Sequence, residues 1–392
     1  MQNDPSSRTV AIACGGTGGH LFPGLAVAAQ FVQQKWAATL LISPKEVDQQ
    51  AVQAAAGATV VTLPAVALNR GGLFAFVRGF FQSYRAVKKL FQSRPPDAVL
   101  AMGGFTAAPP ILAGKRYGAA TFLHESNTIP GRANRWLARL VDQAFVGFPE
   151  TAPRLRNRNV TVTGTPVRAR FRPLDPAKCR AALGLETNRP VLLVMGGSQG
   201  ASGVNSLVIR SLPLLAQFAP DLQYFHLTGQ NEFEKVKQAS AGLKVKAILH
   251  PFFEAMDLAL GAATVAISRA GASSLAELAA MRVPAVLVPF PAATGNHQYH
   301  NARAFETTGA ARLLEQRSAT PGSLSQLILK LTGNGAVRER MREALGQWHQ
   351  PRAAEEIAER MTRAITGRQG TATDASAAAR LAKLDHRQSA IP

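Results

Sequence analysis

The chain has 392 residues and a formal net charge of +20, from 44 Lys and Arg against 24 Asp and Glu. This length favours two domains of about 150–200 residues each. The two cysteines, Cys14 and Cys179, offer neither a disulfide framework nor a zinc motif. No apolar run reaches the ~18 residues of a membrane span, and we expect no signal peptide in residues 1–8. These features argue against disulfide-rich, zinc-binding and membrane-spanning classes.

The positive charge is concentrated within the first half of the chain. Residues 70–139 hold eleven Lys or Arg against only Asp97 and Glu125. Such an excess favours an anionic partner, which could be nucleic acid, a phospholipid surface or a phosphorylated ligand. A generally basic, solvated surface is the alternative explanation.

Strand-like apolar runs alternate with helical runs, which is the order of a parallel α/β fold. A basic, proline-bounded stretch at 166–173 separates two series of runs, and Asp175-Pro176 then begins a helix with an N-cap and a first-turn proline. The predicted strands are 9–13, 38–42, 59–62, 98–102, 120–124, 143–146 and 160–163, then 191–195, 223–227, 245–250, 264–267 and 285–289.

We therefore predict two Rossmann-like domains whose parallel sheets face each other across a cleft. The first domain spans 1–165 and the second 166–350, with a helix at about 351–366 expected to pack back on the first. Residues 367–392 have low complexity, and we expect them to be a disordered tail.

A glycine-rich turn follows the first predicted strand. Residues 14–24 read Cys-Gly-Gly-Thr-Gly-Gly-His-Leu-Phe-Pro-Gly, and a helical run begins at Leu25. Glycines between a strand and a helix let backbone amides at the helix N-terminus face an anion. His20 adds a group that titrates near neutrality beside that anion. The turn therefore predicts chemistry on a phosphorylated ligand.

The sequence argues against a nicotinamide site in this turn. Such a site usually places an acidic residue at the end of the second strand, roughly 20 residues further on. Here that strand is followed by Ser43-Pro44-Lys45, and the turn lacks the G-x-G-x-x-G spacing. An oxidoreductase is therefore disfavoured.

The second half contains a strand, a small-residue turn and a helix start at 267–278, where free amides could bind a diphosphate. Glu277 is consistent with two roles there. It could close a capping box with Ser274, which the local sequence favours, or it could bind the two hydroxyls of a ribose. The polar loop at 289–302 suits a sugar ring or is a surface loop, and His124 lies at the cleft rim or is a buried, hydrogen-bonded histidine.

Seven motifs occur in the order seen in the MurG family of glycosyltransferases, and the match covers about residues 9 to 365. They include Gly-Gly-Thr-Gly-Gly-His-Leu-Phe-Pro-Gly at 15–24, Met-Gly-Gly-Phe at 102–105, His-Glu-Ser-Asn at 124–127 and Gly-Thr-Pro-Val-Arg at 164–168. Gly-Gly-Ser-Gln-Gly-Ala at 196–201, Ser-Arg-Ala-Gly-Ala-Ser-Ser-Leu-Ala-Glu at 268–277 and Asn-His-Gln-Tyr-His-Asn-Ala at 296–302 complete the set. The chain resembles this family, whose members transfer N-acetylglucosamine (GlcNAc) from UDP-GlcNAc to lipid I and so form lipid II in peptidoglycan synthesis.

The resemblance implies a GT-B fold, with the acceptor on the first domain and the nucleotide sugar mainly on the second. It implies a peripheral enzyme at the cytoplasmic face of the plasma (inner) membrane, with cell-wall synthesis or division proteins as further partners. His297 stands where some relatives have a second glutamine, and Phe105 stands where a tyrosine is common. Near the donor sugar and diphosphate the resemblance places Thr17, Gly18 and Gly19, with Asn127 near the sugar. At the diphosphate it places Arg168 and Ser198, and at the uracil Phe253. The implied nucleotide turn comprises Ala272, Ser273, Ser274, Leu275, Ala276 and Glu277, with Glu277 on the ribose, and Gln298 would contact the GlcNAc hydroxyls.

The expected reaction is an inverting displacement at the anomeric carbon, in which a base takes the proton of the attacking hydroxyl. His20 is the leading base and Glu125 the reserve. The sequence has no D-x-D and no cluster of metal ligands, so we expect no cofactor and no metal. Arg168 and helix N-termini would stabilise the departing diphosphate.

A lipid acceptor requires contact with a membrane surface, and residues 73–89 mix aromatic side chains with cations. Helical spacing puts Val77, Phe81 and Tyr84 on one face with Leu73 and Phe80, part of which serves the core, while Phe74 and Phe76 fall elsewhere. The residues expected to dock on anionic lipid are Leu73, Phe74, Phe76, Arg78, Phe80, Phe81, Arg85, Lys88 and Lys89.

Two alternatives remain open at this stage. A UDP-GlcNAc 2-epimerase, or another GT-B glycosyltransferase, would share the donor without the lipid acceptor. A basic nucleic-acid-binding protein would explain the charge, but the chain has no recognised nucleic-acid-binding motif, so we expect no nucleic acid.

Overall fold

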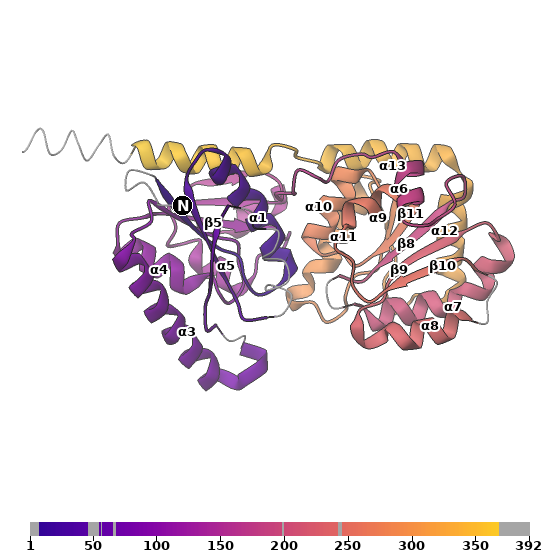
Figure 1. Cartoon of the computed structure of the whole chain (residues 1–392), viewed down its shortest axis with the longest axis horizontal. Coiled ribbons are helices and arrows are strands. Elements are labelled where there is room, and N and C mark those ends of the chain that lie inside the picture. Colours follow the sequence, from indigo (N-terminus) through magenta and orange to yellow (C-terminus); the bar gives the residue numbers. More distant parts are fainter. Residues whose placement is uncertain are drawn as a thin grey trace, which may run out of the picture.

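The computed structural model describes residues 8–45, 55, 57–65, 68–197, 200–241 and 245–367. These residues form two α/β lobes side by side, each built on its own parallel sheet (Figure 1). The predicted fold class is confirmed. The expected tail lies beyond residue 367, outside the described residues.

The N-terminal sheet has seven parallel strands in the order β3-β2-β1-β4-β5-β6-β7. Its central strands were predictable because a parallel strand covered on both faces is a continuous apolar run. All four residues of β4 and all six of β5 are buried. The strands are β1 (Thr9–Ala13), β2 (Ala37–Ile42), β3 (Thr59–Thr62), β4 (Ala98–Ala101), β5 (Ala120–Glu125), β6 (Gln143–Val146) and β7 (Val160–Val162).

Helices cover both faces of this sheet. The helix α1 (Gly18–Gln33) packs on one face together with a helix over residues 353–367, whose Ile357 and Met361 side chains are fully buried in the same core. The other face is covered by α3 (Leu68–Ser93), α4 (Ala108–Arg116) and α5 (Arg132–Leu137). In Figure 1 the last helix, in yellow, runs along the N-terminal lobe after the chain has left the C-terminal one.

The C-terminal sheet has six parallel strands in the order β10-β9-β8-β11-β12-β13. Its helix α6 (Pro176–Ala182) begins as predicted, because the Asp175 side chain accepts hydrogen bonds from the amides of Ala177 and Lys178. The remaining elements are β8 (Val191–Met195), α7 (Ser202–Phe218), β9 (Gln223–Leu227), α8 (Phe233–Ala241), β10 (Ala247–His250), α9 (Met256–Ala262), β11 (Val265–Ser268), α10 (Ala272–Met281), β12 (Ala285–Leu287), α11 (His297–Thr307), β13 (Arg312–Leu313), α12 (Pro321–Gly333) and α13 (Gly335–Trp348).

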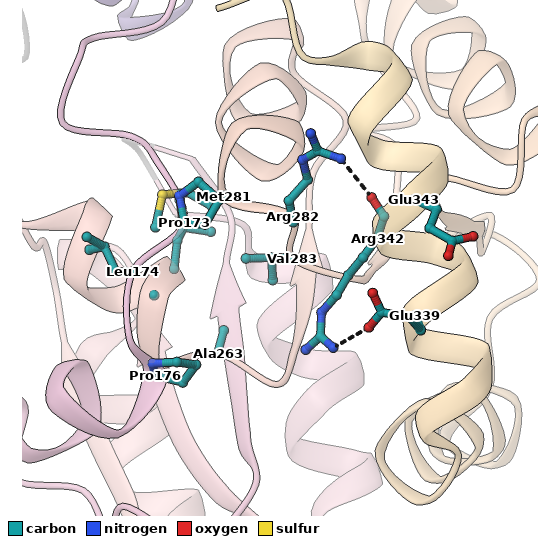
Figure 2. Close-up of a pocket in the computed structure, with 12 residues that line it drawn as sticks. Pro173, Leu174, Pro176, Ala263, Met281, Arg282, Val283, Glu339, Arg342 and Glu343 are labelled. Carbon is teal, nitrogen blue, oxygen red and sulfur yellow. Dashed lines mark hydrogen bonds and ion pairs between the residues drawn. The ribbon is translucent and has the colours of Figure 1, made fainter.

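A side hollow of about 470 Å³ lies between the linker at 173–176, α9, α10 and α13 (Figure 2). Two arginines that line it each contact another lining residue. The Arg282 guanidinium donates to the carbonyl of Arg342 at 3.2 Å, and the Arg342 guanidinium lies 3.1 Å from the Glu339 carboxylate. The first contact joins the end of α10 to α13, and the second lies within α13.

Candidate active site

The two sheets point their carboxyl ends toward a cleft of about 970 Å³ between the lobes, which both domains line. Parallel α/β folds place ligands at this edge. Leu275 is buried in the core of the C-terminal domain, and neither it nor Ala276 lines the cleft. Ser198 lies outside the described residues. The predicted site residues that line the cleft are Thr17, Gly18, Gly19, His20, Glu125, Asn127, Arg168, Phe253, Ala272, Ser273, Ser274, Glu277 and Gln298.

His20 lies in the first turn of α1 and is held on two sides. Its Nδ1 is 3.1 Å from the hydroxyl oxygen of Thr17. Its ring packs on Gly103 and Gly104, where an added Cβ would come within 3.1 Å of ring atoms. Both glycines have positive φ, of 107° and 78°, which disfavours other residues. The Met-Gly-Gly-Phe motif therefore forms the surface against which the imidazole is oriented.

Glu125 is a buried carboxylate at the end of β5 whose two oxygens accept four hydrogen bonds. Oε1 accepts from the backbone and side-chain amides of Asn127, at 2.9 and 3.0 Å. Oε2 accepts from the Gly131 amide at 2.9 Å and from the Asn134 side chain at 2.8 Å. Four donors satisfy the lone pairs of an ionised carboxylate. The geometry therefore favours a role in shaping the loop between β5 and α5, at 126–131, over proton transfer.

His124 is fully buried, as in the second of its two predicted interpretations. Its Nε2 is 3.0 Å from the carbonyl of Gly164 and its Nδ1 is 3.2 Å from the Ser126 hydroxyl. Burial lowers the pKa of His124, so the ring is neutral near pH 7. It joins β5 to the start of the interdomain linker.

The helix α10 begins at the nucleotide turn, and its N-cap is Gly271. Ser274 lies inside the first turn, so the capping box with Glu277 does not form. Glu277 instead pairs with Arg168 of the linker, with 3.4 Å between Oε1 and Nη2. Burial raises the pKa of Glu277, and the Arg168 guanidinium offsets part of that rise. The first amides of α10 lack intrahelical acceptors and face the cleft.

Arg168 also contacts Phe22, a residue for which the sequence suggested no role. The guanidinium carbon lies 4.2 Å from the centroid of the Phe22 ring in α1 and 4.9 Å from that of Phe171. The Nε atom of Arg168 is buried and has no hydrogen-bond partner among the described residues. Phe22 of the N-terminal domain thus supports the Arg168 side chain, whose Nε–H remains available as a donor at the cleft.

The far wall of the cleft carries Phe253 and Gln298. The Phe253 ring packs edge-on against Phe225, with centroids 5.1 Å apart, and lies at the same distance from His250. Gln298 accepts a hydrogen bond from the Phe290 amide at 2.9 Å, which directs its carbonyl oxygen to the loop and leaves its amide nitrogen to donate. The aromatic ring of Phe253 suits a flat nucleobase, and the amide of Gln298 suits a ring that carries hydroxyl groups.

Arg269 in the Ser-Arg-Ala-Gly motif is buried and fixes the same loop. Its Nη1 donates to the carbonyls of Val288 and Pro289, at 2.9 and 3.0 Å. Burial lowers the pKa of Arg269 to about 10, which leaves it charged at neutral pH. A charged donor at these carbonyls stabilises the segment that orients Gln298.

The predicted docking segment is α3, which bends at Gly72, where φ is 68°. Phe74 is 81% exposed and Phe81 56%, and Val77 lies between them at 41%. This i, i+3, i+7 spacing places Phe74, Val77 and Phe81 in one exposed stripe. The predicted face is therefore not a single surface. Its members Val77 and Phe81 lie with Phe74 in the stripe, whereas Tyr84 is half-buried against the core. Arg78, Arg85 and Lys89 are exposed, Phe76, Phe80 and Lys88 are half-buried, and the Leu73 side chain lies outside the described residues.

No helix in the described part of the chain combines the length and apolarity of a membrane span. The same residues contain no group of three or more His, Cys, Asp or Glu that could hold a metal ion.

Family models match both domains of the chain. The glycosyltransferase family 28 N-terminal domain matches residues 10–146, and the glycosyltransferase family 28 C-terminal domain matches residues 191–361. The chain is 36% identical over 368 residues to the UDP-N-acetylglucosamine–N-acetylmuramyl-(pentapeptide) pyrophosphoryl-undecaprenol N-acetylglucosamine transferase of Anaeromyxobacter sp. (strain Fw109-5), covering 92% of this chain and 94% of the relative. The transferase of the same name from Sorangium cellulosum is 36% identical over 358 residues, covering 89% of this chain and 87% of the relative.

Solved structures agree with this likeness. MurG of Acinetobacter baumannii superposes with a TM-score of 0.70 at 27% identity, covering 91% of this chain and 99% of the other. A Listeria monocytogenes protein assigned by name to the UDP-N-acetylglucosamine 2-epimerases has a TM-score of 0.68 at 15% identity, covering 90% of this chain and 95% of the other. At that identity the second likeness shows a common fold alone.

Proposed function

Since the chain belongs to the MurG family within glycosyltransferase family 28, we propose that it transfers GlcNAc from UDP-GlcNAc to the C4 hydroxyl of the N-acetylmuramoyl group of lipid I. The products are lipid II and UDP, and the pathway is peptidoglycan synthesis. The observation that carries the proposal is the cleft itself. It combines His20 from the N-terminal domain with Phe253 and Glu277 from the C-terminal domain, which would bind the nucleotide.

The donor lies mainly on the C-terminal domain. Phe253 frames the uracil, Glu277 accepts from the ribose hydroxyls, and Gln298 donates to the sugar. The amides of Ala272, Ser273 and Ser274 face the diphosphate at the start of α10. The proposed division at residues 165 and 166 fits this arrangement, because 166–350 would then supply the nucleotide wall.

The reaction inverts the anomeric carbon. The acceptor hydroxyl attacks from the N-terminal side while UDP leaves toward Arg168 and α10. His20 takes the hydroxyl proton: with Nδ1–H donating to Thr17, Nε2 carries the lone pair. Glu125 is the weaker candidate, because four donors already occupy its carboxylate.

Charge on the departing diphosphate is balanced without a metal ion. The half-buried Arg168, with its unused Nε donor, and the first amides of α10 supply the compensating positive potential. This proposal concerns the chemical step and is tested by turnover in a chelator.

The enzyme docks peripherally on the cytoplasmic face of the plasma membrane. The stripe of Phe74, Val77 and Phe81, flanked by Arg78 and Arg85, supports docking on anionic lipid, since apolar and cationic groups act together at such a surface. The same face would bring the lipid-linked acceptor to the N-terminal domain.

The test is transfer of labelled GlcNAc from UDP-GlcNAc to a lipid I analogue with EDTA present. Wild type should form product, and His20→Ala should lower kcat by about 10²–10⁴-fold. His300→Ala is the control, because this exposed histidine on α11 does not line the cleft. Absence of product from wild type in EDTA and in added Mg²⁺ would overturn the function. Product in Mg²⁺ alone would overturn only metal independence.

A further inference from the structure

Asn301 on α11 is a fully buried amide whose hydrogen-bonding capacity is completely used. Its Oδ1 accepts from the amide of Thr128 at 3.0 Å and from the Thr128 hydroxyl at 2.9 Å. Its Nδ2 donates to Oδ1 of Asn127 at 3.0 Å and to the carbonyl of Ala270 at 3.1 Å. Two lone pairs and two N–H groups therefore meet two donors and two acceptors, which also fixes the orientation of the amide.

Three of these four bonds cross between the domains. Thr128 and Asn127 belong to the loop after β5 in the N-terminal domain, and Thr128 is itself buried. Ala270 belongs to the turn that leads into α10 of the C-terminal domain. One side chain thus connects the loop at 126–131 to the turn that leads into α10. Because these hydrogen bonds are buried, breaking one of them would leave a polar group unsatisfied away from water, which is costly. We refer to the bonds of Asn301 as the tie.

The tie lies between the two groups proposed to hold the sugar. Asn127 lines the cleft from the N-terminal wall, and its Oδ1 is one of the two acceptors of Asn301. Gln298 lines it from the C-terminal wall and lies one helical turn before Asn301 on α11. Residues three apart on a helix share a face, so the first turn of α11 cannot move relative to Asn127 while these bonds hold.

We propose that Asn301 is the positioning residue that sets the separation of Asn127 and Gln298, and thereby the fit of the cleft to the donor sugar. This inference rests on the proposed function, since it requires the sugar to bridge the two walls. Asn301 does not line the cleft, so it acts through its neighbours. The nucleotide contacts of Phe253 and Glu277 lie on the C-terminal domain and do not require the tie.

The proposal therefore predicts a selective loss. In Asn301→Ala the Kd for UDP-GlcNAc should rise about tenfold, while the Kd for UDP should stay within about twofold of wild type. Thr128→Val removes one of the four bonds and should raise the Kd for UDP-GlcNAc about threefold. Titration calorimetry with UDP and UDP-GlcNAc, together with thermal unfolding of each variant, measures both effects.

Asn157→Ala is the matched control. Asn157 makes three hydrogen bonds, to Ala138, Val141 and Asn159, all within the N-terminal domain and away from the cleft. Asn157→Ala should lower the melting temperature, but the Kd for UDP-GlcNAc should not rise relative to the Kd for UDP. If Asn301→Ala does not fold, Thr128→Val decides the outcome.

Equal weakening of UDP and UDP-GlcNAc in the tested variant, or weakening of neither, would overturn the positioning role. Failure of the proposed function has a different signature, because wild type itself would then form no product with a lipid I analogue, whatever the Kd values of the variants.

Discussion

Nη2 of Arg168 lies 3.4 Å from Oε1 of Glu277, so the interdomain linker is joined by an ion pair to the helix that begins at the nucleotide turn. Each side chain is less than one-fifth exposed. A carboxylate in such surroundings is ionised at a cost in solvation, which the arginine and a bound ribose would offset.

Glu277→Gln keeps the shape of the side chain and removes its charge. The Kd for UDP should rise by about tenfold or more, since hydrogen bonds from the ribose hydroxyls to a charged acceptor are lost. In wild type the affinity for UDP should fall as the pH drops through the pKa of Glu277, because the protonated acid cannot accept both hydroxyls. That pKa is raised above its usual value of 4.5, so the fall begins at a higher pH than for an exposed glutamate. Calorimetry of UDP binding as a function of pH measures it, and the same fall in Glu277→Gln would contradict the assignment.

Phe22→Leu keeps an apolar side chain and removes the aromatic face on which Arg168 rests. A partly desolvated cation–π contact contributes about 1–2 kcal/mol, so KM for UDP-GlcNAc should rise about five- to thirtyfold. Phe218→Leu is the control, because Phe218 at the end of α7 is 61% exposed and lies outside the cleft. Steady-state kinetics of both variants decide the matter, and equal KM values for the two would remove Phe22 from the site.

An element of the fold could be predicted from the sequence where the residues that determine it are neighbours in the chain. β8 is a run of five buried apolar residues, and its position follows from the sequence alone. β13 has only two residues, Arg312 and Leu313, too few for any periodicity, and it was missed. The capping box was wrong because Ser274 and Glu277 have suitable spacing, but Gly271 provides the N-cap and Glu277 turns to the linker.

The site residues missed by the sequence are those that act across the domain boundary. Phe22 occurs in a quoted motif but has the appearance of one more apolar core residue in α1. Asn301 is one of several polar residues in a loop-to-helix segment, and only one of its four hydrogen bonds, to the carbonyl of Ala270, is made within its own domain. Its partners Asn127 and Thr128 are more than 170 positions away in the chain, so their proximity depends on how the domains meet.

Gly104→Ala should lower kcat by crowding His20. At Gly104 φ is 78°, and an added Cβ would lie 3.1 Å from Nδ1 of His20. Gly118 has the same φ of 78°, with no atom within 4 Å of an added Cβ. Both variants carry the backbone strain of a left-handed alanine, about 1 kcal/mol, and should unfold at similar temperatures. Only Gly104→Ala should lose turnover, and comparable kcat values would show that the imidazole does not depend on this turn.

Folding stability should fall in mild acid because of His226. Burial lowers the pKa of His226 to about 4, whereas the unfolded value is 6.5. Between these values the unfolded chain binds the proton and the folded chain does not, so stability is present above pH 6.5 and is lost as the pH falls toward 4. The loss amounts to about 3 kcal/mol. Urea unfolding of His226→Gln across this range should show a shallower slope, with part of the remainder due to His124 and His349, whose pKa values burial also lowers. An unchanged slope would show that His226 binds its proton over the same pH range in the folded and the unfolded chain.

Binding to anionic vesicles should depend on the exposed face of α3. Changing Arg78 and Arg85 to glutamine removes two cations beside the stripe that contains Phe81, at about 1 kcal/mol each near the surface. Partitioning onto vesicles that contain anionic lipid should fall about 30-fold. The matched control changes Lys235 and Lys237, two exposed cations on α8 of the C-terminal domain, to glutamine. A flotation assay at fixed salt compares the pairs. Equal losses would mean that net charge alone drives binding, whereas a loss confined to the α3 pair would identify this face as the one that meets the membrane.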